Sequence, residues 1–324
     1  MDLIAFGGVF LELVFGHIER LPGPGEEIFS DEFAISCGGA VTIATAARRE
    51  QMSAGIASLL GDDLGSRVVW EHCQREGIDL SACTQVAGTT AGITVVINFA
   101  GDRAFVSHVP PRPAGEPGER DRWREVLERE RPAWAYLHAG RDIVPFLRRA
   151  HEIGTRVVVD LNLEAIERGA DELYECIEIA DVFVPNEDEL CRLTGLCADE
   201  AIGEVATWRT PTVVKRGGGG AVVVAAGRAE TVTAGLADVT VRDRTGAGDS
   251  FAGAMIAALA RGETLVAAAA AGNVAGSAAV ARLGAVGEVE VAGLSVSSEL
   301  RRALDVQVMA ALTERVATGE EERG

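Results

Sequence analysis

Residues 243–254 read Asp-Arg-Thr-Gly-Ala-Gly-Asp-Ser-Phe-Ala-Gly-Ala, and they stand where a short polar run gives way to an apolar segment. The alanine-rich residues that follow predict a helix over about residues 247–260. Because Gly246, Ala247 and Gly248 are small, backbone N–H groups at the start of this helix can approach a ligand closely. The free N–H groups and the helix dipole at that end attract anions. The stretch therefore predicts an anion hole.

Asp249 is the acidic side chain of this predicted anion hole. A carboxylate there can accept a proton from a substrate hydroxyl while the neighbouring N–H groups hold a phosphoryl group. This predicts a phosphotransfer site with Asp249 as the general base. The alternative from these residues alone is a glycine-rich turn in which Asp249 is an ordinary acid of the first helical turn.

The overall composition is typical of a large α/β protein that does not bind polyanions. The chain has 324 residues, of which 48% are hydrophobic, enough for an extensive core. Its 49 acidic and 30 basic residues give a net charge of −19, which repels nucleic acid and anionic membrane surfaces. A phosphorylated ligand remains compatible with this charge, because a local pocket of N–H groups overrides the global field.

The cysteines and the apolar segments indicate a cytoplasmic protein. No two of the six cysteines have CxxC spacing, which favours reduced thiols over disulfides or a metal site. The first residues lack the basic and apolar parts of a signal peptide. The longest apolar run, residues 265–271, is too short to span a bilayer. We therefore expect no membrane partner.

Apolar strands alternate with helical segments along most of the chain. After residue 120, strands are expected at 133–138, 156–161, 181–184, 212–215 and 220–226, and helices at 142–153, 164–179 and 187–208. The remaining sequence adds strands at 3–10 and 54–60, and helices at 38–49, 64–77, 263–282 and 298–316. This alternation predicts a mostly parallel sheet with helices on both faces, a three-layer α/β sandwich.

A second, smaller sheet is expected in the first third of the chain. Residues 92–99 and 103–109 are β-rich runs joined by Ala-Gly-Asp, a hairpin signal. With residues 11–37, they predict a small antiparallel sheet inserted between βα units. The predicted domains are a core of residues 1–10, 38–84 and 110–318, a small β-lid of residues 11–37 and 85–109, and a disordered acidic tail at 319–324.

The wider string around Asp249 resembles a signature of the ribokinase-like (PfkB) carbohydrate kinases, written D-T-x-G-A-G-D-x-F. Further motifs of that family occur in the family's order. They are Gly38-Gly39, Gly61-Asp62-Asp63-Leu64-Gly65, Asp160-Leu161-Asn162, Asn186-Glu187-Asp188-Glu189, Lys215–Gly220 and Arg282-Leu283-Gly284-Ala285. On these motifs the chain is identified as a member of the family, and the resemblance implies a ribokinase-like fold.

The resemblance also implies ATP as the phosphoryl donor and assigns roles to individual residues. It makes Asp249 the base and the backbone of residues 246–248 the anion hole. The implied nucleotide-binding residues are Asn186, Lys215, Gly217, Gly220, Asn273 and Gly284. Lys215 replaces the threonine that the family has before its nucleotide loop. It either adds positive charge near the triphosphate or is a solvated end of a strand.

Two cation sites are implied as well. Glu189 would hold Mg²⁺ together with Asn186, through water, as suits an ion that keeps part of its hydration shell. The same two residues fit the N-cap and N3 positions of a helix, and both interpretations can hold together. Asp243 and Thr245 would help to bind a monovalent cation such as K⁺, and the alternative for them is a role in a turn.

On the substrate side the chain departs from the family's pattern. Gly38 and Gly39 are implied to lie beside the sugar, and Glu12 takes the place of an aspartate that holds substrate hydroxyls. Phe10 stands where many members have a polar residue, and Ile43 stands where they have asparagine. These two apolar residues leave room for a flatter or partly apolar substrate. The alternative is ordinary core packing or a shift of one residue in the alignment.

Two residues outside these motifs complete the set of candidates. Arg103, in the predicted lid, either binds an anionic group of the substrate or is simply solvated. His138 shows no spacing typical of a ligand set, and we expect it to be structural or exposed, like His17, His72 and His151.

These observations predict a kinase for a sugar or a sugar-like alcohol, in which Asp249 deprotonates a primary hydroxyl beneath the lid. A nucleoside kinase of the same superfamily is the first alternative, since Phe10 can stack on a base. A catalytically silent ligand-binding relative is the second. The apolar strands of the lid have exposed edges, which predicts a homodimer through the lid.

Overall fold

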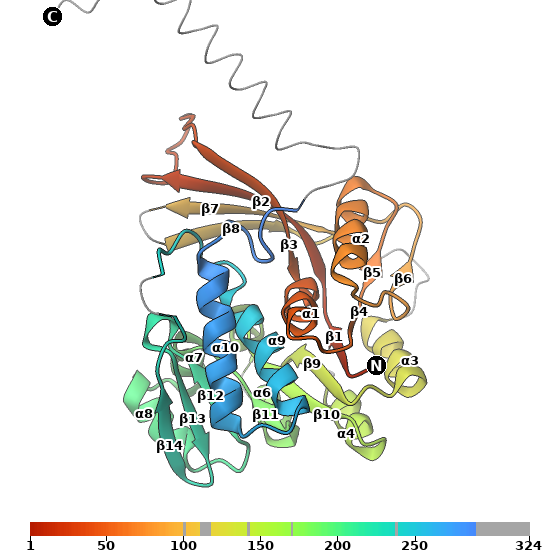
Figure 1. The fold of residues 1–324 in the computed structure, drawn as a ribbon, viewed down its shortest axis with the longest axis vertical. Coiled ribbons are helices and arrows are strands. Elements are labelled where there is room, and N and C mark those ends of the chain that lie inside the picture. The colour runs from red at the N-terminus through yellow and green to blue at the C-terminus, as the bar shows by residue number, and fades with distance from the viewer. Residues whose placement is uncertain (100–101, 111–117, 141–142, 170, 237–238, 290–324) are drawn as a thin grey trace, which may run out of the picture.

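The main sheet has eight strands in the order β14-β13-β12-β11-β10-β9-β1-β4 (Figure 1). The structure is a computed structural model that describes residues 1–99, 102–110, 118–140, 143–169, 171–236 and 239–289. The strands are β1 Leu3–Phe6, β4 Ala54–Ala57, β9 Trp134–His138, β10 Arg156–Asp160, β11 Val182–Phe183, β12 Thr212–Lys215, β13 Ala221–Ala225 and β14 Arg228–Val232. All neighbouring pairs from β12 to β4 are parallel, and the β12–β13 and β13–β14 pairs are antiparallel, so β13 alone runs against the other strands. The mostly parallel sheet is confirmed.

Helices cover both faces of this sheet. They are α1 Ala40–Arg49, α2 Leu64–Glu76, α3 Glu119–Glu130, α4 Val144–Glu152, α5 Leu163–Arg168, α6 Asp171–Ile179, α7 Glu187–Thr194, α8 Ala198–Val205, α9 Ala247–Ala260 and α10 Leu265–Val280. Leu3 and Ala5 pack in one core cluster with α1, α2, α9 and α10, whereas Ile4 and Phe6 pack in another with α3, α4 and α6 to α8. Alternate residues of β1 thus enter opposite layers, as a strand buried on both faces requires.

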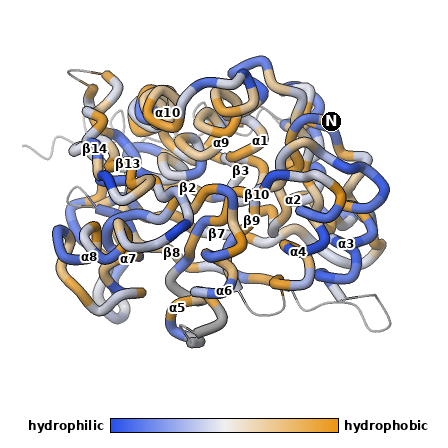
Figure 2. The backbone as a smooth tube through the Cα atoms, turned by 90° about the horizontal axis from the view of Figure 1, so that it is seen from below, coloured by the Kyte–Doolittle hydropathy of each residue, from blue (hydrophilic) through white to orange (hydrophobic). Residues whose placement is uncertain are grey.

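The two long helices α9 and α10 are almost wholly apolar, and Figure 2 shows them coloured mainly as hydrophobic. Their small residues allow close helix packing. Gly253 of α9 faces α1, where an added Cβ would overlap the carbonyl oxygen of Ile43 and lie 2.8 Å from the Cβ of Ala46. None of the helices in the described part of the chain is long and apolar enough to cross a membrane.

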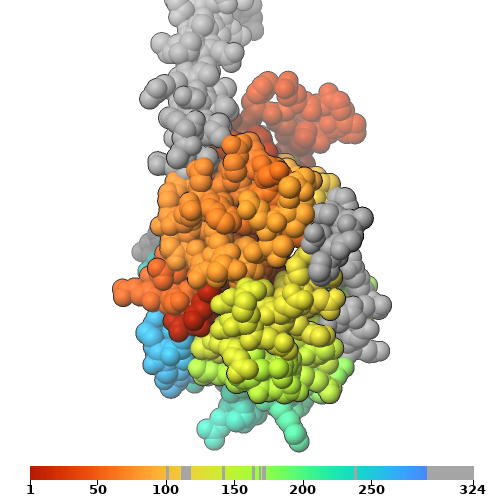
Figure 3. All heavy atoms as spheres, turned by 90° about the vertical axis from the view of Figure 1, so that its right-hand side faces the viewer, coloured from red at the N-terminus to blue at the C-terminus, as the bar shows by residue number. Residues whose placement is uncertain are grey.

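A separate four-stranded sheet, which we call the small sheet, has the order β3-β2-β7-β8. Its strands are β2 Val9–Ile18, β3 Glu32–Gly39, β7 Gly92–Phe99 and β8 Asp102–His108. Two pairings are antiparallel, and the central β2–β7 pairing is parallel because α1, β4 and α2 intervene in the chain. Figure 3 shows the red-orange chain between β2 and β3 projecting from the body of the molecule. The predicted second sheet is confirmed. A further pair, β5 Leu59–Leu60 and β6 Thr84–Gln85, is short.

Several predicted elements differ at their ends. The predicted strand 3–10 stops at Phe6, and β2 begins afresh at Val9 and continues to Ile18. The predicted helix 187–208 is two helices, because Gly195 ends α7 in the left-handed conformation with φ of 71°. The predicted helix 164–179 is likewise divided. The helix α3 and strand β14 were not predicted, and the predicted helix 298–316 and tail lie outside the described residues.

We expect the substitution Gly253→Ala to lower the free energy of unfolding by about 1–3 kcal/mol, because the added methyl group has no space against α1. This loss should appear even though alanine has the higher helix propensity by about 1 kcal/mol. Gly203→Ala in α8 is the matched control, since nothing lies within 4 Å of its added Cβ, and it should raise stability slightly. Urea unfolding followed by circular dichroism measures both. Equal effects of the two substitutions would show that the α1–α9 contact is looser than described.

Candidate active site

The site is built around the first turn of α9. Gly246 is the N-cap of this helix, in the left-handed conformation with φ of 71°. An added Cβ at Gly246 would overlap Ala285, so this position requires glycine both for its conformation and for space. Asp249 lies in the first helical turn and is half-buried. The carboxylate therefore stands beside the free N–H groups of a helix N-terminus, as the sequence predicted.

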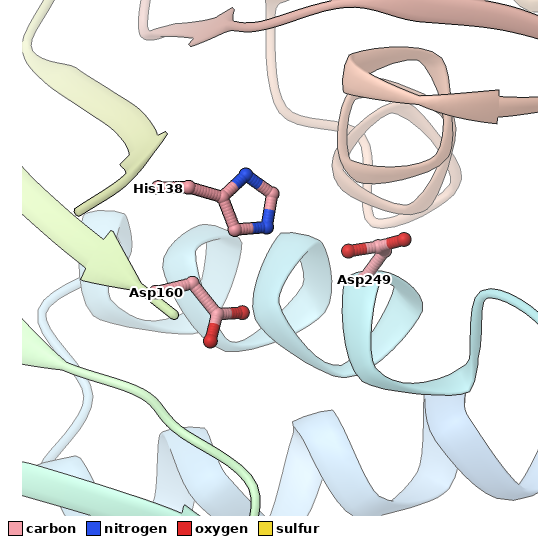
Figure 4. Close-up of side chains that lie close together, drawn as sticks. All are labelled: His138, Asp160 and Asp249. Carbon is pink, nitrogen blue, oxygen red and sulfur yellow. The ribbon is translucent and has the colours of Figure 1, made fainter. Parts of the chain in front are cut away.

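Two strands of the main sheet bring further polar groups to Asp249. His138 is the last residue of β9 and Asp160 is the last residue of β10. One ring nitrogen of His138 and one carboxylate oxygen from each of the two aspartates lie within 4.8 Å of one another (Figure 4). In Figure 4 the three side chains, from two strand ends and a helix start, point into a common space. This is the edge of a parallel sheet at which ligand sites of α/β proteins gather.

A buried ion pair lies next to this cluster. The ammonium nitrogen of Lys215, at the end of β12, is 2.7 Å from the Asp160 Oδ2 atom. The Tyr136 hydroxyl donates to the same oxygen at 2.9 Å, and the Leu161 N–H donates to the other at 2.8 Å. The Asp160 carboxylate is thus held by three donors. Lys215 remains charged because its carboxylate neighbours raise its pKa against the effect of burial.

Asn186 and Glu189 form a capping box at the start of α7. The Asn186 side chain accepts from the Glu189 N–H at 2.8 Å, and the Glu189 side chain accepts from the Asn186 N–H at 2.9 Å. Burial, followed by the charge of Asp160, raises the pKa of Glu189 to about 7. The helix-capping interpretation is thereby confirmed, and the carboxylate also contributes charge to the site.

The pKa of Asp249 is raised by burial, while the nearby charges of His138 and Lys215 oppose this rise. Asp160, Glu189 and Asp249 therefore form a group of carboxylates that repel one another. Oxygen donors in such an arrangement suit a hard divalent cation, and added positive charge would relieve the repulsion. The residues present fit Mg²⁺.

The small sheet contributes a buried acid, Glu12, to the site. Glu12 of β2 is 6% exposed, and its Oε2 atom accepts a hydrogen bond from the Ala285 N–H at 3.2 Å. Burial, followed by the charges of Asp243 and Asp249, raises its pKa from 4.5 to about 7. An added Cβ at Gly38 would overlap the Glu12 carboxylate, so the glycine makes space for this acid.

The register of the small sheet places four polar residues in one row. Ser36, Glu12, Thr94 and Ser107 are cross-strand neighbours in the order β3-β2-β7-β8, so their side chains lie on the same face. The Thr94 and Ser107 hydroxyls are 3.0 Å apart, and the Ser36 hydroxyl donates to the Gly287 carbonyl at 2.9 Å. This face is therefore turned toward the loop that follows α10.

The remaining substrate-side candidates occupy different surroundings. The Phe10 ring packs over glycine backbone, since an added Cβ at Gly39 would lie 3.1 Å from it and one at Gly92 would overlap it at 2.5 Å. Ile43 is 1% exposed and belongs to the core cluster that includes residues of α9. Arg103 is half-buried, its Nε atom has no partner among the described residues, and its charge lowers the pKa of Asp249. Substrate-binding roles for all of these stay predictions.

The other predicted residues surround the start of α9 and the end of β12. The buried Asp243 carboxylate accepts from the Thr245 N–H at 2.8 Å, the Thr245 hydroxyl at 2.6 Å and the Gly284 N–H at 2.8 Å. These bonds form a turn, and a cation-binding role stays a prediction. Gly217 lies in an exposed 3₁₀ turn that Gly220 closes. The Asn273 amide donates to the carbonyls of residues 232 and 233, which fixes β14 against α10.

Sequence reasoning missed three contributors to the site. His138 was expected to be structural or exposed, but it lies beside Asp249 because it ends a strand at the site edge of the sheet. That position, at the carboxyl end of a predicted strand, was the available signal. Thr94 and Ser107 join Glu12 only through the strand register, for which the sequence carried no signal.

Comparisons with known proteins agree with this geometry. A family model described as pfkB family carbohydrate kinase matches residues 19–291. The chain is 26% identical over 264 residues to the deoxyribokinase of Salmonella typhi, covering 78% of this chain and 84% of that protein. It is 26% identical over 275 residues to the cytidine kinase of Thermococcus kodakarensis, covering 82% and 91%.

Solved structures show the same fold. A structure described as a putative ribokinase II of E. coli, in its apo form, has a TM-score of 0.73 at 20% identity and covers 90% of this chain and 96% of that one. The ribokinase of Arabidopsis thaliana, complexed with ribose and ATP, has a TM-score of 0.68 at 21% identity, with 88% and 94% covered. The ribokinase-like fold predicted from the motifs is confirmed.

The raised pKa of Glu12 predicts a specific pH dependence of stability. Between pH 4.5 and pH 7 the carboxyl group ionises in the unfolded chain but not in the folded one, so rising pH lowers the free energy of unfolding. Glu12→Gln removes this titration and keeps an oxygen that can accept from Ala285. We expect the variant to gain stability relative to the wild type by up to about 3 kcal/mol across this window, with no further change above it. Urea unfolding at a series of pH values measures the difference, and a pH-independent difference would contradict the assignment.

Proposed function

The chain belongs to the pfkB family of carbohydrate kinases, and we propose that it transfers the γ-phosphoryl group of ATP to a hydroxyl of a sugar or sugar-like small molecule, with Asp249 as the general base. The observation that carries this assignment is the Asp249 carboxylate in the first turn of α9, beside free helix N–H groups and a buried lysine. A base and an anion site at hydrogen-bonding distance from one another are what phosphotransfer to a hydroxyl requires.

In the proposed mechanism, Asp249 accepts the proton of the attacking hydroxyl as the oxygen approaches the phosphoryl group. The backbone N–H groups of residues 246–248 hold the negative charge that the transferring group carries. Burial raises the pKa of Asp249, and His138 and Lys215 oppose this rise. The small sheet would close over the substrate as a lid and exclude water, which limits hydrolysis of ATP.

The nucleotide is proposed to lie along the ends of β12 and β13. Support comes from the exposed glycine turn at residues 217–219 and from Asn273, which borders the same region on α10. The other proposed nucleotide contacts are Asn186, Lys215, Gly220 and Gly284. Use of ATP is supported by the related ribokinase that was solved with ATP and ribose.

Two cations are part of the proposal. Mg²⁺ would be held through water by Glu189 near Asn186, and when bound it supplies positive charge to the phosphate oxygens. The neighbouring carboxylates of Asp160 and Asp249 have the oxygen donors that this ion prefers. A monovalent cation such as K⁺ is proposed beside Asp243 and Thr245, where a buried carboxylate and a hydroxyl already lie together.

The substrate is proposed to lie between Glu12 and Asp249, with Gly38 and Gly39 beside it. Burial, and to a smaller extent the charges of Asp243 and Asp249, raise the pKa of Glu12. Phe10 and Ile43 are proposed to form apolar walls, and Arg103 is proposed to bind an anionic group if the substrate has one. A nucleoside is the second candidate substrate, favoured by the likeness to a cytidine kinase and by an aromatic ring at position 10.

We expect Asp249→Asn to lower kcat by about 10²–10⁴-fold, because the amide cannot accept the proton. The test is an ADP-release assay with ATP across pentoses, deoxyribose, hexoses, sugar phosphates, polyols and nucleosides. Asp188→Asn is the matched control, an exposed acid of the first turn of α7, and it should keep wild-type turnover.

Two results would contradict the proposal. Wild-type turnover by Asp249→Asn on the best substrate would show that another group is the base. If no compound is phosphorylated while one of them raises the melting temperature, the chain is a ligand-binding relative without kinase activity.

A homodimer through the small sheet is also proposed. The face opposite the polar row carries two apolar rows, one of Ile35, Leu13, Val95 and Val106 and the other of Phe33, Phe15, Ile97 and Ala104. Val106 is 65% exposed, and the others are half-buried rather than buried. Leu13 and Ile35 also pack on the core of the same chain, so Val95, Val106 and the second row are the part of this face proposed to be buried against a second copy.

A cytoplasmic location is proposed as well. The six cysteines are all free thiols, which supports this location.

We expect Val95→Glu to convert this dimer to a monomer, because two buried carboxylates would face each other without partners. Leu64→Glu is the control, an exposed apolar residue of α2 outside the small sheet, and it should leave the dimer intact. Sedimentation velocity of the wild type and both variants at micromolar concentration measures the state. A monomeric wild type, or a dimeric Val95→Glu variant, would rule out this interface.

A further inference from the structure

Lys215 is held in one position by a chain of contacts. Its ammonium nitrogen lies 2.7 Å from the Asp160 Oδ2 atom, and its side chain is only 12% exposed. Asp160 is fixed in turn by the Tyr136 hydroxyl and by the backbone N–H of the next residue. At its base, the Lys215 N–H donates to the Pro185 carbonyl at 2.9 Å. A long flexible side chain is thus immobilised before any ligand binds.

The immobilised ammonium group lies against the start of α9. A Cβ added to Gly248 would be 3.4 Å from the Lys215 nitrogen, so the lysine occupies the space that the missing side chain leaves open. An ammonium group has three N–H donors. One is used by Asp160, and among the described residues no other acceptor bonds to this nitrogen. The remaining donors are therefore available beside the anion hole of residues 246–248.

A purely structural role does not explain why Lys215 lies among several charged side chains. Glu189 and Asp249 also act on the ammonium group, so one cation stands among three carboxylates. A salt bridge that served only to neutralise Asp160 would not need to lie at the helix N-terminus where the phosphoryl group is proposed to bind.

We propose that Lys215 contacts the phosphoryl group during its transfer and that Asp160 is the residue that positions it. The proposal rests on the proposed kinase function and adds a catalytic residue to it. A preorganised cation beside the anion hole stabilises the charge that develops on the transferring group, and it does so more strongly in the transition state than in bound ATP. Its removal should therefore lower kcat more than it raises KM for ATP.

The first test is Lys215→Met, which keeps the length of the side chain and removes its charge. We expect kcat to fall by about 10²-fold or more while KM for ATP changes by less than about threefold. The control is Arg148→Met, since Arg148 is an exposed cation of α4 that pairs with Glu175 and belongs to none of the proposed binding segments. A fall in kcat of less than about threefold, or a rise in KM at constant kcat, would overturn the proposal.

The second test separates catalysis from stability, because Lys215→Met leaves a buried carboxylate without its partner. In the double variant Lys215→Met/Asp160→Asn the pair is neutral, and we expect the melting temperature to recover while kcat stays low. Recovery of kcat together with the melting temperature would show that the salt bridge only supports the fold.

The third test does not depend on turnover. ADP binding is measured by calorimetry with and without aluminium fluoride, a mimic of the transferring phosphoryl group, in the presence of the best acceptor from the panel. Lys215→Met should lose about tenfold or more of the gain in affinity that the mimic gives the wild type, with ADP binding alone unchanged. An unchanged gain would overturn the assignment of Lys215. Absence of any phosphorylated acceptor for the wild type would instead contradict the kinase function itself.

Discussion

The buried carboxylate of Asp243 is the support on which the geometry of the site depends. It accepts two hydrogen bonds from Thr245 and one from the backbone of Gly284, and in this way ties the segment before α9 to the loop after α10. Gly246 packs on the same loop with no room for a side chain. The first turn of α9 therefore has a defined position, and Asp249 takes its place from that turn. Asp243 and Gly284 are about 40 residues apart in the sequence, so the anion hole is fixed by contacts between distant segments.

Charge is the second constraint, because a kinase must place a carboxylate next to an anionic donor. Burial and then the charge of Asp160 raise the pKa of Glu189 to about 7, and the same two effects raise the pKa of Asp249. Lys215 and His138, at the same sheet edge, oppose the rise at Asp249. In the proposed complex, a bound metal ion would add positive charge among these carboxylates.

The features that were predicted correctly from the sequence are those that depend on neighbouring residues in the chain. The helix start at residues 246–249 and the capping box of Asn186 and Glu189 depend on neighbours within a few positions, and both were predicted correctly as local structure. The role of His138 depends on which strand ends lie side by side, and that order follows from the whole sheet. The break in the predicted helix 187–208 was missed because the apolar pattern continues beyond it. Gly195, in the left-handed conformation, ends α7 there.

The two sides of the site are therefore encoded in different ways, and this has a consequence for specificity. The phosphotransfer side is a short string that tolerates little change, because Gly246 has no space for a side chain beside Ala285 and Gly248 is in contact with Lys215. The substrate side is a row of residues from four strands, brought together by register alone. Phe10 lies on the same face in the neighbouring row, paired with Gly38 and Gly92. If this face binds the substrate as proposed, substitutions on it can change specificity while the first turn of α9 is preserved.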